Sequence, residues 1–138
     1  MAVIGDLQTG IETRLATVSA IRANDTAPNL VNARLDKPVA WVELESVSYH
    51  ETFNGKADFV FVVTLVMPLA AGLERAIDAL NPYLDTTGTR SIKVAIEGGR
   101  TLGGAADDTT VRTAYDVGLL EAGDYRYAGA KWRIEVTG

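Results

Sequence analysis

The stretch DFVFVVTLVM, residues 58–67, decides the fold of this chain. Alternate side chains of an extended strand point to opposite faces. One face would then carry Phe59, Phe61, Val63, Leu65 and Met67, and the other Val60, Val62, Thr64 and Val66. An antiparallel strand with one wet face should alternate apolar with polar residues, and this one does not. We therefore expect helices of the chain to cover one face and another layer or another subunit to meet the face of Val60, Val62 and Val66.

The segments on either side of this strand indicate an antiparallel hairpin. Residues 39–49 alternate as a strand until the last three, where the apolar parity switches and predicts a bulge or the end of pairing. Asn54-Gly55 is a strong hairpin signal, because a tight primed turn needs positive φ at both central residues. A two-residue loop would place Glu51 opposite Asp58, which is unfavourable, so we expect a wider connection.

Three helices are predicted around these strands. Residues 4–21 carry apolar side chains at helical spacing and form one buried stripe. Residues 70–81 form a second helix, which Pro82 should end or kink in its last turn. A short helix over 92–97 follows a serine N-cap and is stopped by a glycine pair.

Two further strands are predicted in the last third of the chain. Residues 111–119 alternate as a half-buried strand, and the turn EAGD, 121–124, leads to a last strand in which Gly129 occupies a natural bulge position. A short extra strand is expected near 21–23. The element order predicts one α+β domain, 1–138, with a mainly antiparallel sheet of four to five strands and with two main helices and one short helix packed on one face.

The composition argues against several classes of partner and site. The 138 residues carry a net charge of −5 and a sequence pI of about 4.8, which disfavours general nucleic-acid binding and docking on an anionic membrane. The absence of cysteine excludes disulfides, thiolate metal sites and a cysteine nucleophile. The first residues show no basic flank before an apolar run, and the longest apolar run, 59–71, is too short to span a bilayer. We therefore expect a soluble protein that stays inside the cell that makes it.

The stretch RTLGGAADDTTV, residues 100–111, brings two glycines close to two aspartates. As a phosphate loop it lacks the lysine and the Ser/Thr that follow the glycines in nucleotide-binding loops. As a metal site it is weak, because Asp107 and Asp108 would point to opposite sides of an extended chain. We interpret it as a surface loop leading into a strand, and we predict neither a bound cofactor nor a metal.

No catalytic set can be assembled from the sequence. His50 is the only histidine, so a Ser-His-Asp arrangement cannot be argued around it. Glu43 and Glu45 share a strand face, as a glycosidase pair could, but a solvated or ion-paired strand face is the simpler interpretation. We expect that the chain is not an enzyme.

Several motifs point to a family when they are taken together. Residues 87–138 contain a short SIK-A-E helix, a TLGG…DD…V connection and a final strand pair with D-Y-x-Y-x-G. The N-terminal half adds a P-x2-W-V strand, a long apolar strand and an L-x2-A-I-D-A-L helix. This pattern resembles the tail terminator proteins of long-tailed bacteriophages, the minor tail protein U-like family, and especially those from phages of actinobacteria.

The resemblance implies a structural virion protein. Members of the family form a homo-hexameric ring at the head-proximal end of the tail tube, where the ring ends tube polymerisation and offers a surface to a head-completion or connector protein. Genomic DNA passes through the lumen without specific binding. The implied location is the neck of the virion, after assembly in the host cytoplasm, and no membrane is involved.

Two polar, glycine-bearing segments are our candidates for contacts with neighbouring subunits, the tail tube protein or the head-side protein, since binding residues tend to lie on loops held by a rigid scaffold. The hairpin contributes Asn54, Gly55 and Lys56, and the later loop contributes Gly103, Gly104, Asp107 and Asp108.

Two alternatives remain open at this point. One is another neck component, such as a head–tail connector or a tail-completion protein with a similar small α+β fold. The other is a small-ligand-binding or enzymatic α+β domain, which would need a polar pocket. The sequence offers no residues that we would place in such a pocket, and a resemblance of fold alone does not decide between these functions.

Overall fold

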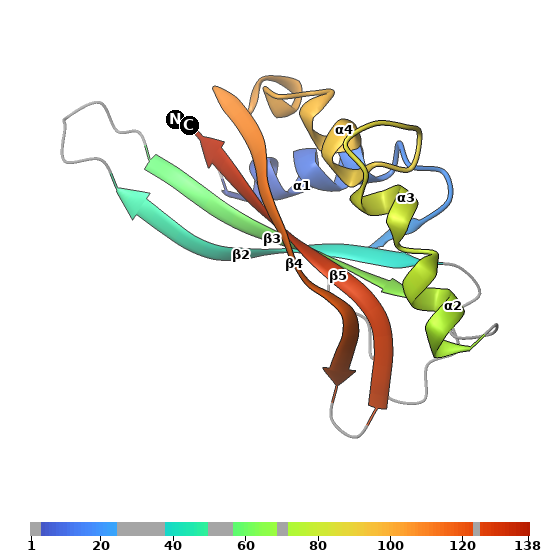
Figure 1. Cartoon of the computed structure of the whole chain (residues 1–138). Coiled ribbons are helices and arrows are strands. Elements are labelled where there is room, and N and C mark those ends of the chain that lie inside the picture. The colour runs from blue at the N-terminus through green and yellow to red at the C-terminus, as the bar shows by residue number, and fades with distance from the viewer. Residues whose placement is uncertain (1–3, 25–37, 50–56, 69–71, 123–124) are drawn as a thin grey trace.

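The computed structural model of the chain describes residues 4–24, 38–49, 57–68, 72–122 and 125–138. Within these residues a five-stranded sheet carries the helices on one face (Figure 1), which confirms the predicted α+β class. The strands are β1 (Arg22–Asn24), β2 (Val39–Tyr49), β3 (Ala57–Met67), β4 (Asp108–Ala122) and β5 (Tyr125–Thr137). The helices are α1 (Ile4–Leu15), α2 (Leu73–Asp78), α3 (Asn81–Leu84), α4 (Ile92–Glu97) and the 3-10 turn η1 (Leu102–Gly104).

The strands lie in the order β1-β2-β3-β5-β4. β3 is central and pairs antiparallel with both β2 and β5. β1, the expected short extra strand, pairs parallel with residues 39–41 of β2, so the sheet is mixed but mostly antiparallel. In Figure 1, β4 and β5 cross β2 and β3 steeply, as expected of a strongly twisted sheet.

The core lies between the sheet and the helices. The helix-side residues of β3 are buried as predicted, namely Phe59, Phe61, Val63, Leu65 and Met67. The matching stripe of α1 is fully buried and consists of Leu7, Ile11 and Leu15. Because these side chains form one cluster with the inward residues of β2 and β5, the sheet and helices share a single core.

The first helix is shorter than predicted, since α1 ends at Leu15 and not at residue 21. Thr17 closes the helix: its hydroxyl and its backbone N–H both donate to the carbonyl of Arg14, over 2.6 and 3.2 Å. Val18 and Ile21 are nevertheless buried, so the apolar stripe continues into the turn that leads to β1.

The second predicted helix, over 70–81, is divided. Its described part forms α2, and a second short helix, α3, begins at Asn81. Pro82 occupies the first turn of α3, where its missing N–H would have no partner within the helix anyway. The predicted kink at Pro82 is therefore a new helix start. Residues 70 and 71 lie outside the described part of the chain.

The short helix α4 has the predicted bounds and the predicted cap. Ser91 Oγ accepts the backbone N–H of Val94 over 3.2 Å, and the same hydroxyl donates to the carbonyl of Asp85 over 2.6 Å. The helix ends at Glu97, before the glycine pair.

The register of β2 against β3 confirms the predicted bulge. The pairing shifts between Leu44 and Ser46, which leaves Glu45 as the extra residue. Asp58 pairs with Ser48 and not with Glu51, which agrees with a connection wider than two residues. The Asn54-Gly55 turn itself lies outside the described residues.

The bulge predicted at Gly129 is on the partner strand. β5 runs without interruption against β3, whereas β4 carries the extra residues, between Val111 and Thr113 and between Tyr115 and Gly118. At the second bulge both Asp116 and Gly118 have positive φ, 50° and 111°. Each bulge breaks the side-chain alternation, so the half-buried pattern predicted for 111–119 is wrong beyond the first bulge: Val117 and Leu119 are exposed.

One glycine of α1 can be tested as a close-packing position. A Cβ at Gly10 would lie 2.7 Å from Leu102 Cβ, whereas a Cβ at Gly5 on the same helix would meet nothing within 4 Å. We expect Gly10→Ala to lower the free energy of unfolding by about 1 kcal/mol or more, because overpacking outweighs the gain in helix propensity. Gly5→Ala should raise it by up to about 1 kcal/mol. Urea unfolding of both variants checks this, and stabilisation by both would contradict the close contact.

Candidate interaction surface

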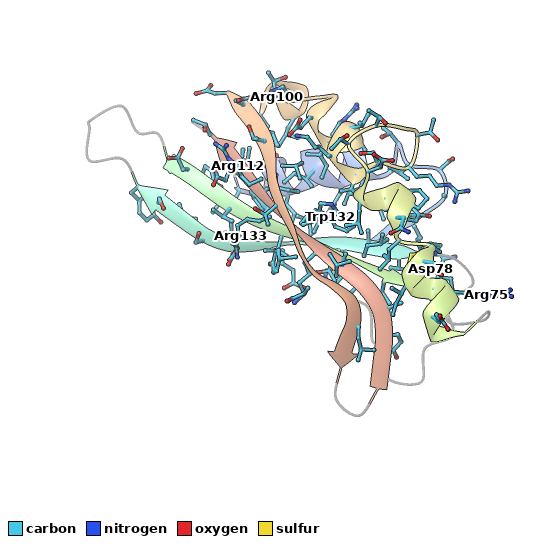
Figure 2. The ribbon with its side chains drawn as sticks, in the orientation of Figure 1. Arg75, Asp78, Arg100, Arg112, Trp132 and Arg133 are labelled. Atoms are coloured by element: carbon cyan, nitrogen blue, oxygen red, sulfur yellow. The ribbon has the colours of Figure 1, made fainter. Side chains whose placement is uncertain are left out.

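The sheet face opposite the helices, called the open face below, contains Val60, Val62 and Val66, for which the sequence predicted cover by another layer or another subunit. Its described residues include Glu43, Glu45 and Ser46 of β2, Val60, Val62, Thr64 and Val66 of β3, Lys131, Arg133 and Glu135 of β5, and Thr110, Thr113 and Tyr115 of β4. Figure 2 shows Arg133 on this face and Trp132 on the helix side. The open face is therefore a charged surface built around a row of valines.

An ion pair that spans β3 shields the centre of this row. Arg133 of β5 lies beside Val62 in the register, and its Nε reaches Glu45 Oε2 of β2 over 3.2 Å. The guanidinium carbon also lies 5.0 Å from the centroid of the Tyr115 ring, a cation–π distance. Val60 and Val62 are half-buried. Part of the cover that we expected from another subunit thus comes from long side chains of the chain itself, whose stems lie along apolar surface.

Two more ion pairs extend the network toward the β4 edge. Arg112 Nε lies 2.8 Å from Glu135 Oε2, and Lys131 Nζ lies 3.9 Å from Asp116 Oδ2. All four side chains are more than a third exposed, so each pair contributes little to stability. Their importance is that they leave charge accessible on this side of the sheet.

Val66 lies at the other end of the row and is buried within the chain. It forms a second apolar cluster with Val39, Trp41 and Tyr127, each less than a tenth exposed. Trp41 Nε1 donates to Glu43 Oε1 over 2.7 Å, which satisfies the indole N–H. Of the three valines proposed for an interface, Val60 and Val62 are accessible and Val66 is not.

The stretch 100–111 lies against the body of the protein and does not project from it. Leu102 and Ala106 are buried, and Leu102 packs against Gly10 of α1. Leu102, Gly103 and Gly104 all have positive φ, which turns the chain back toward the sheet. Gly103 and Gly104 are exposed. They line an open groove of about 650 Å³ against α1.

The two aspartates of this stretch play different parts. The backbone N–H of Asp107 donates to the carbonyl of Thr137 over 2.8 Å and so extends the β4–β5 pairing. Asp108 makes a two-point contact with Arg100, over 2.7 Å from Nε and 3.1 Å from Nη2. The hydrogen bonds from Arg100 hold the pKa of the Asp108 carboxyl below its ordinary value. Asp108 is thus ion-paired to Arg100 at the start of β4.

The carboxylate of Glu97 links α4 to β4. Its carboxylate oxygens accept Lys93 Nζ over 2.8 and 2.7 Å, and Oε2 also accepts the backbone N–H of Val111 over 2.9 Å. Arg100 Nη1 lies 3.9 Å away. Burial opposes ionisation of this carboxyl, but the Lys93 and Val111 hydrogen bonds and the nearby cations outweigh it, so its pKa is lower than usual.

The sequence-predicted interface residues do not form one surface. Val60 and Val62 lie on the open face, Gly103 and Gly104 lie beside α1, and Asp108 lies at the start of β4. Asn54, Gly55 and Lys56 lie outside the described residues. Within the described part of the chain, no three His, Cys, Asp or Glu side chains group as metal ligands, and no helix is long and apolar enough to cross a membrane.

The unpaired edges of the sheet are a feature that the sequence reasoning missed. Among the described residues, β4 has a strand neighbour on its β5 side alone, and β2 has β1 beside it only at residues 39–41. Gln8 Nε2 donates to the carbonyl of Val42 over 3.3 Å, so the open part of the β2 edge begins after that residue. Only the strand order reveals these edges, and no local pattern encodes that order.

Comparison with known proteins adds no family. No protein-family model matches the chain, and no curated protein sequence matches it.

The lowered pKa of Glu97 predicts that the stability of the fold depends on pH. Because its folded-state pKa lies below the ordinary 4.5, ionised Glu97 stabilises the fold above about pH 4.5, and this contribution is lost as the pH falls through the lowered pKa. Glu97→Gln should lower the free energy of unfolding at pH 7 by about 1–2 kcal/mol. The difference in unfolding free energy between the variant and the natural protein should shrink toward pH 3.

Urea unfolding at several pH values measures this gap. Glu74→Gln on the exposed side of α2 is the matched control and should leave stability nearly unchanged at every pH. If the loss of unfolding free energy in Glu97→Gln stayed constant from pH 7 to pH 3, the charge of Glu97 would play no part in linking α4 to β4.

Proposed function

We propose that this chain is the tail terminator subunit of a long-tailed bacteriophage, forming a ring at the head-proximal end of the tail tube. The observation that carries the proposal is the resemblance of residues 87–138, with its SIK-A-E helix, TLGG…DD…V connection and D-Y-x-Y-x-G strand pair. The fold is compatible with it: α4, the η1 connection and the β4–β5 pair occupy those three parts of the pattern in that order.

The edges of the sheet support assembly with further copies. A strand edge without a neighbour presents backbone donors and acceptors to another chain. Among the residues that the structure describes, β4 and most of β2 are such edges, at opposite sides of one sheet. A contact between two different surfaces of identical chains is heterologous, and it closes into a ring when the rotation between neighbours allows.

The proposed role is structural. The ring would stop tube polymerisation and bind a head-completion or connector protein, and DNA would pass its lumen without specific binding. The net charge of −5 suits a passage in which DNA slides without sticking.

Native mass and tail length together test the proposal. We expect the purified protein to give a sixfold species by native mass spectrometry in the micromolar range. We also expect deletion of its gene to give phage tails longer than normal. Tails of normal length left unattached to heads would instead indicate a head-side connector. A stable dimer with normal phage assembly would favour a ligand-binding domain.

A further inference from the structure

The groove between α1 and the η1 connection has one wall built from a single face of α1. The α1 residues that line it recur at helical spacing and are Asp6, Thr9, Gly10, Thr13 and Arg14. Gly99 and residues 102–105 form the opposite wall, and Figure 1 shows this connection running beside α1. The volume of about 650 Å³ lies within the range of small-molecule sites.

Both walls of the groove offer hydrogen-bonding groups. Gly103 and Gly104 line it, are exposed and have positive φ. Because neither carries a side chain, a ligand can approach the backbone of this turn closely. On the α1 wall, the Thr13 hydroxyl donates to the carbonyl of Thr9 over 2.9 Å, and its oxygen can still accept a hydrogen bond.

Arg14, at one end of the groove, is held in place but has donors to spare. Its Nε donates to the carbonyl of Ala95 over 2.8 Å, and a Cβ at Gly99 would lie 2.8 Å from Arg14 Cδ. Arg14 is half-buried, and no carboxylate of the described residues lies within ion-pair distance of its guanidinium. A fixed guanidinium with free N–H groups matches the paired oxygens of a carboxylate.

Asp6 carries the other charge among the described residues that line the groove. It is exposed, and no cation in the described part of the chain lies within ion-pair distance of its carboxylate. Asp6 and Arg14 are eight residues apart, which is about 12 Å along the axis of α1. One charge of each sign at the two ends favours a ligand that carries both signs over a simple anion.

We propose that this groove binds a small zwitterionic molecule, with its carboxylate on Arg14 and its ammonium group at Asp6. The two charges of the ligand lie about 12 Å apart, which is close to the separation of the termini in an extended peptide of four residues. The middle of the ligand meets Thr13 and the backbone of Gly103 and Gly104. The site goes beyond the proposed terminator function and does not depend on it.

Tetraglycine, whose termini carry these two charges, is the probe. Saturation-transfer NMR follows the signals of the probe, so the measurement works whatever the oligomeric state of the protein. At pH 7 and low salt we expect saturable binding with a Kd of about 1 mM or below. Tetraglycinamide, which lacks the carboxylate, should bind at least about tenfold more weakly. N-acetyl-tetraglycine should bind about threefold more weakly, since Asp6 is exposed.

Two variants connect each end of the probe to one residue. Asp6→Asn should bind tetraglycine and N-acetyl-tetraglycine equally, because the ammonium group then has no carboxylate to meet. Arg14→Gln should likewise lose the preference for tetraglycine over tetraglycinamide. Since Arg14 also joins α1 to α4, circular dichroism checks the fold of this variant. If Arg14→Gln does not fold, Asp6→Asn decides, because it changes an exposed side chain.

Matched controls make the same kinds of change on another helix. Asp78→Asn and Arg75→Gln each remove one charge from an exposed residue of α2. Figure 2 shows Arg75 and Asp78 well away from Arg100, which lies close to the η1 wall of the groove. Both controls should bind all three probes like the natural protein.

Three results would overturn the proposal. Tetraglycine could show no saturable binding up to about 10 mM, or Asp6→Asn could keep the natural preference for the free amine. Inorganic phosphate could also bind more tightly than tetraglycine, which would show a simple anion site. Tail length tests the terminator function separately, so failure of that function leaves the groove proposal intact, and the reverse holds too.

Discussion

β3 is hydrogen-bonded along both of its sides, buried on its helix side and partly covered on its open face, and the placement of the other elements follows from this constraint. β2 and β5 flank it without a break in the β5 register, and the helix-side residues of β3 meet the stripe of α1 and the inward side chains of its neighbours. On the open face, the Glu45–Arg133 pair spans the strand and a small cluster buries Val66. A strand so rich in β-branched and aromatic residues fits no edge position, because its apolar faces need cover on both sides.

The helix side is organised by short polar contacts around this core. Arg14 Nε of α1 donates to the carbonyl of Ala95 in α4 over 2.8 Å, and its side chain occupies the space that Cβ atoms at Gly98 and Gly99 would fill. Glu97 then joins α4 to β4 through the backbone of Val111. The stretch 100–111, which the sequence predicts to be a surface loop leading into a strand, connects the helix layer to the sheet edge and lies against α1 through the buried Leu102.

Local patterns predicted most of the elements, and nonlocal contacts explain the rest. The central strand, the Ser91 cap, the bulge in β2 and the extra strand at β1 all carry signals within a few residues. The bulges of β4 depend on its pairing with an uninterrupted β5. The end of α1 at Leu15 is instead a local feature, set by the bonds from Thr17 to the carbonyl of Arg14, and the apolar spacing that continues to Ile21 concealed it. The Glu45–Arg133 pair joins residues 88 positions apart, and the open edges follow from strand order. Neither of these has a sequence period that could have revealed it.

The two bulges of β4 also determine where such a chain can gain or lose residues. Deleting the extra residue at either bulge would convert the irregular stretch into ordinary pairing while leaving both flanks in their present register with β5. Single-residue insertions and deletions are therefore better accommodated near Arg112 or Asp116 than in β3 or β5, where a one-residue slip would turn every buried side chain to the opposite face. We expect relatives of this chain to differ in length in β4 sooner than in β3 or β5.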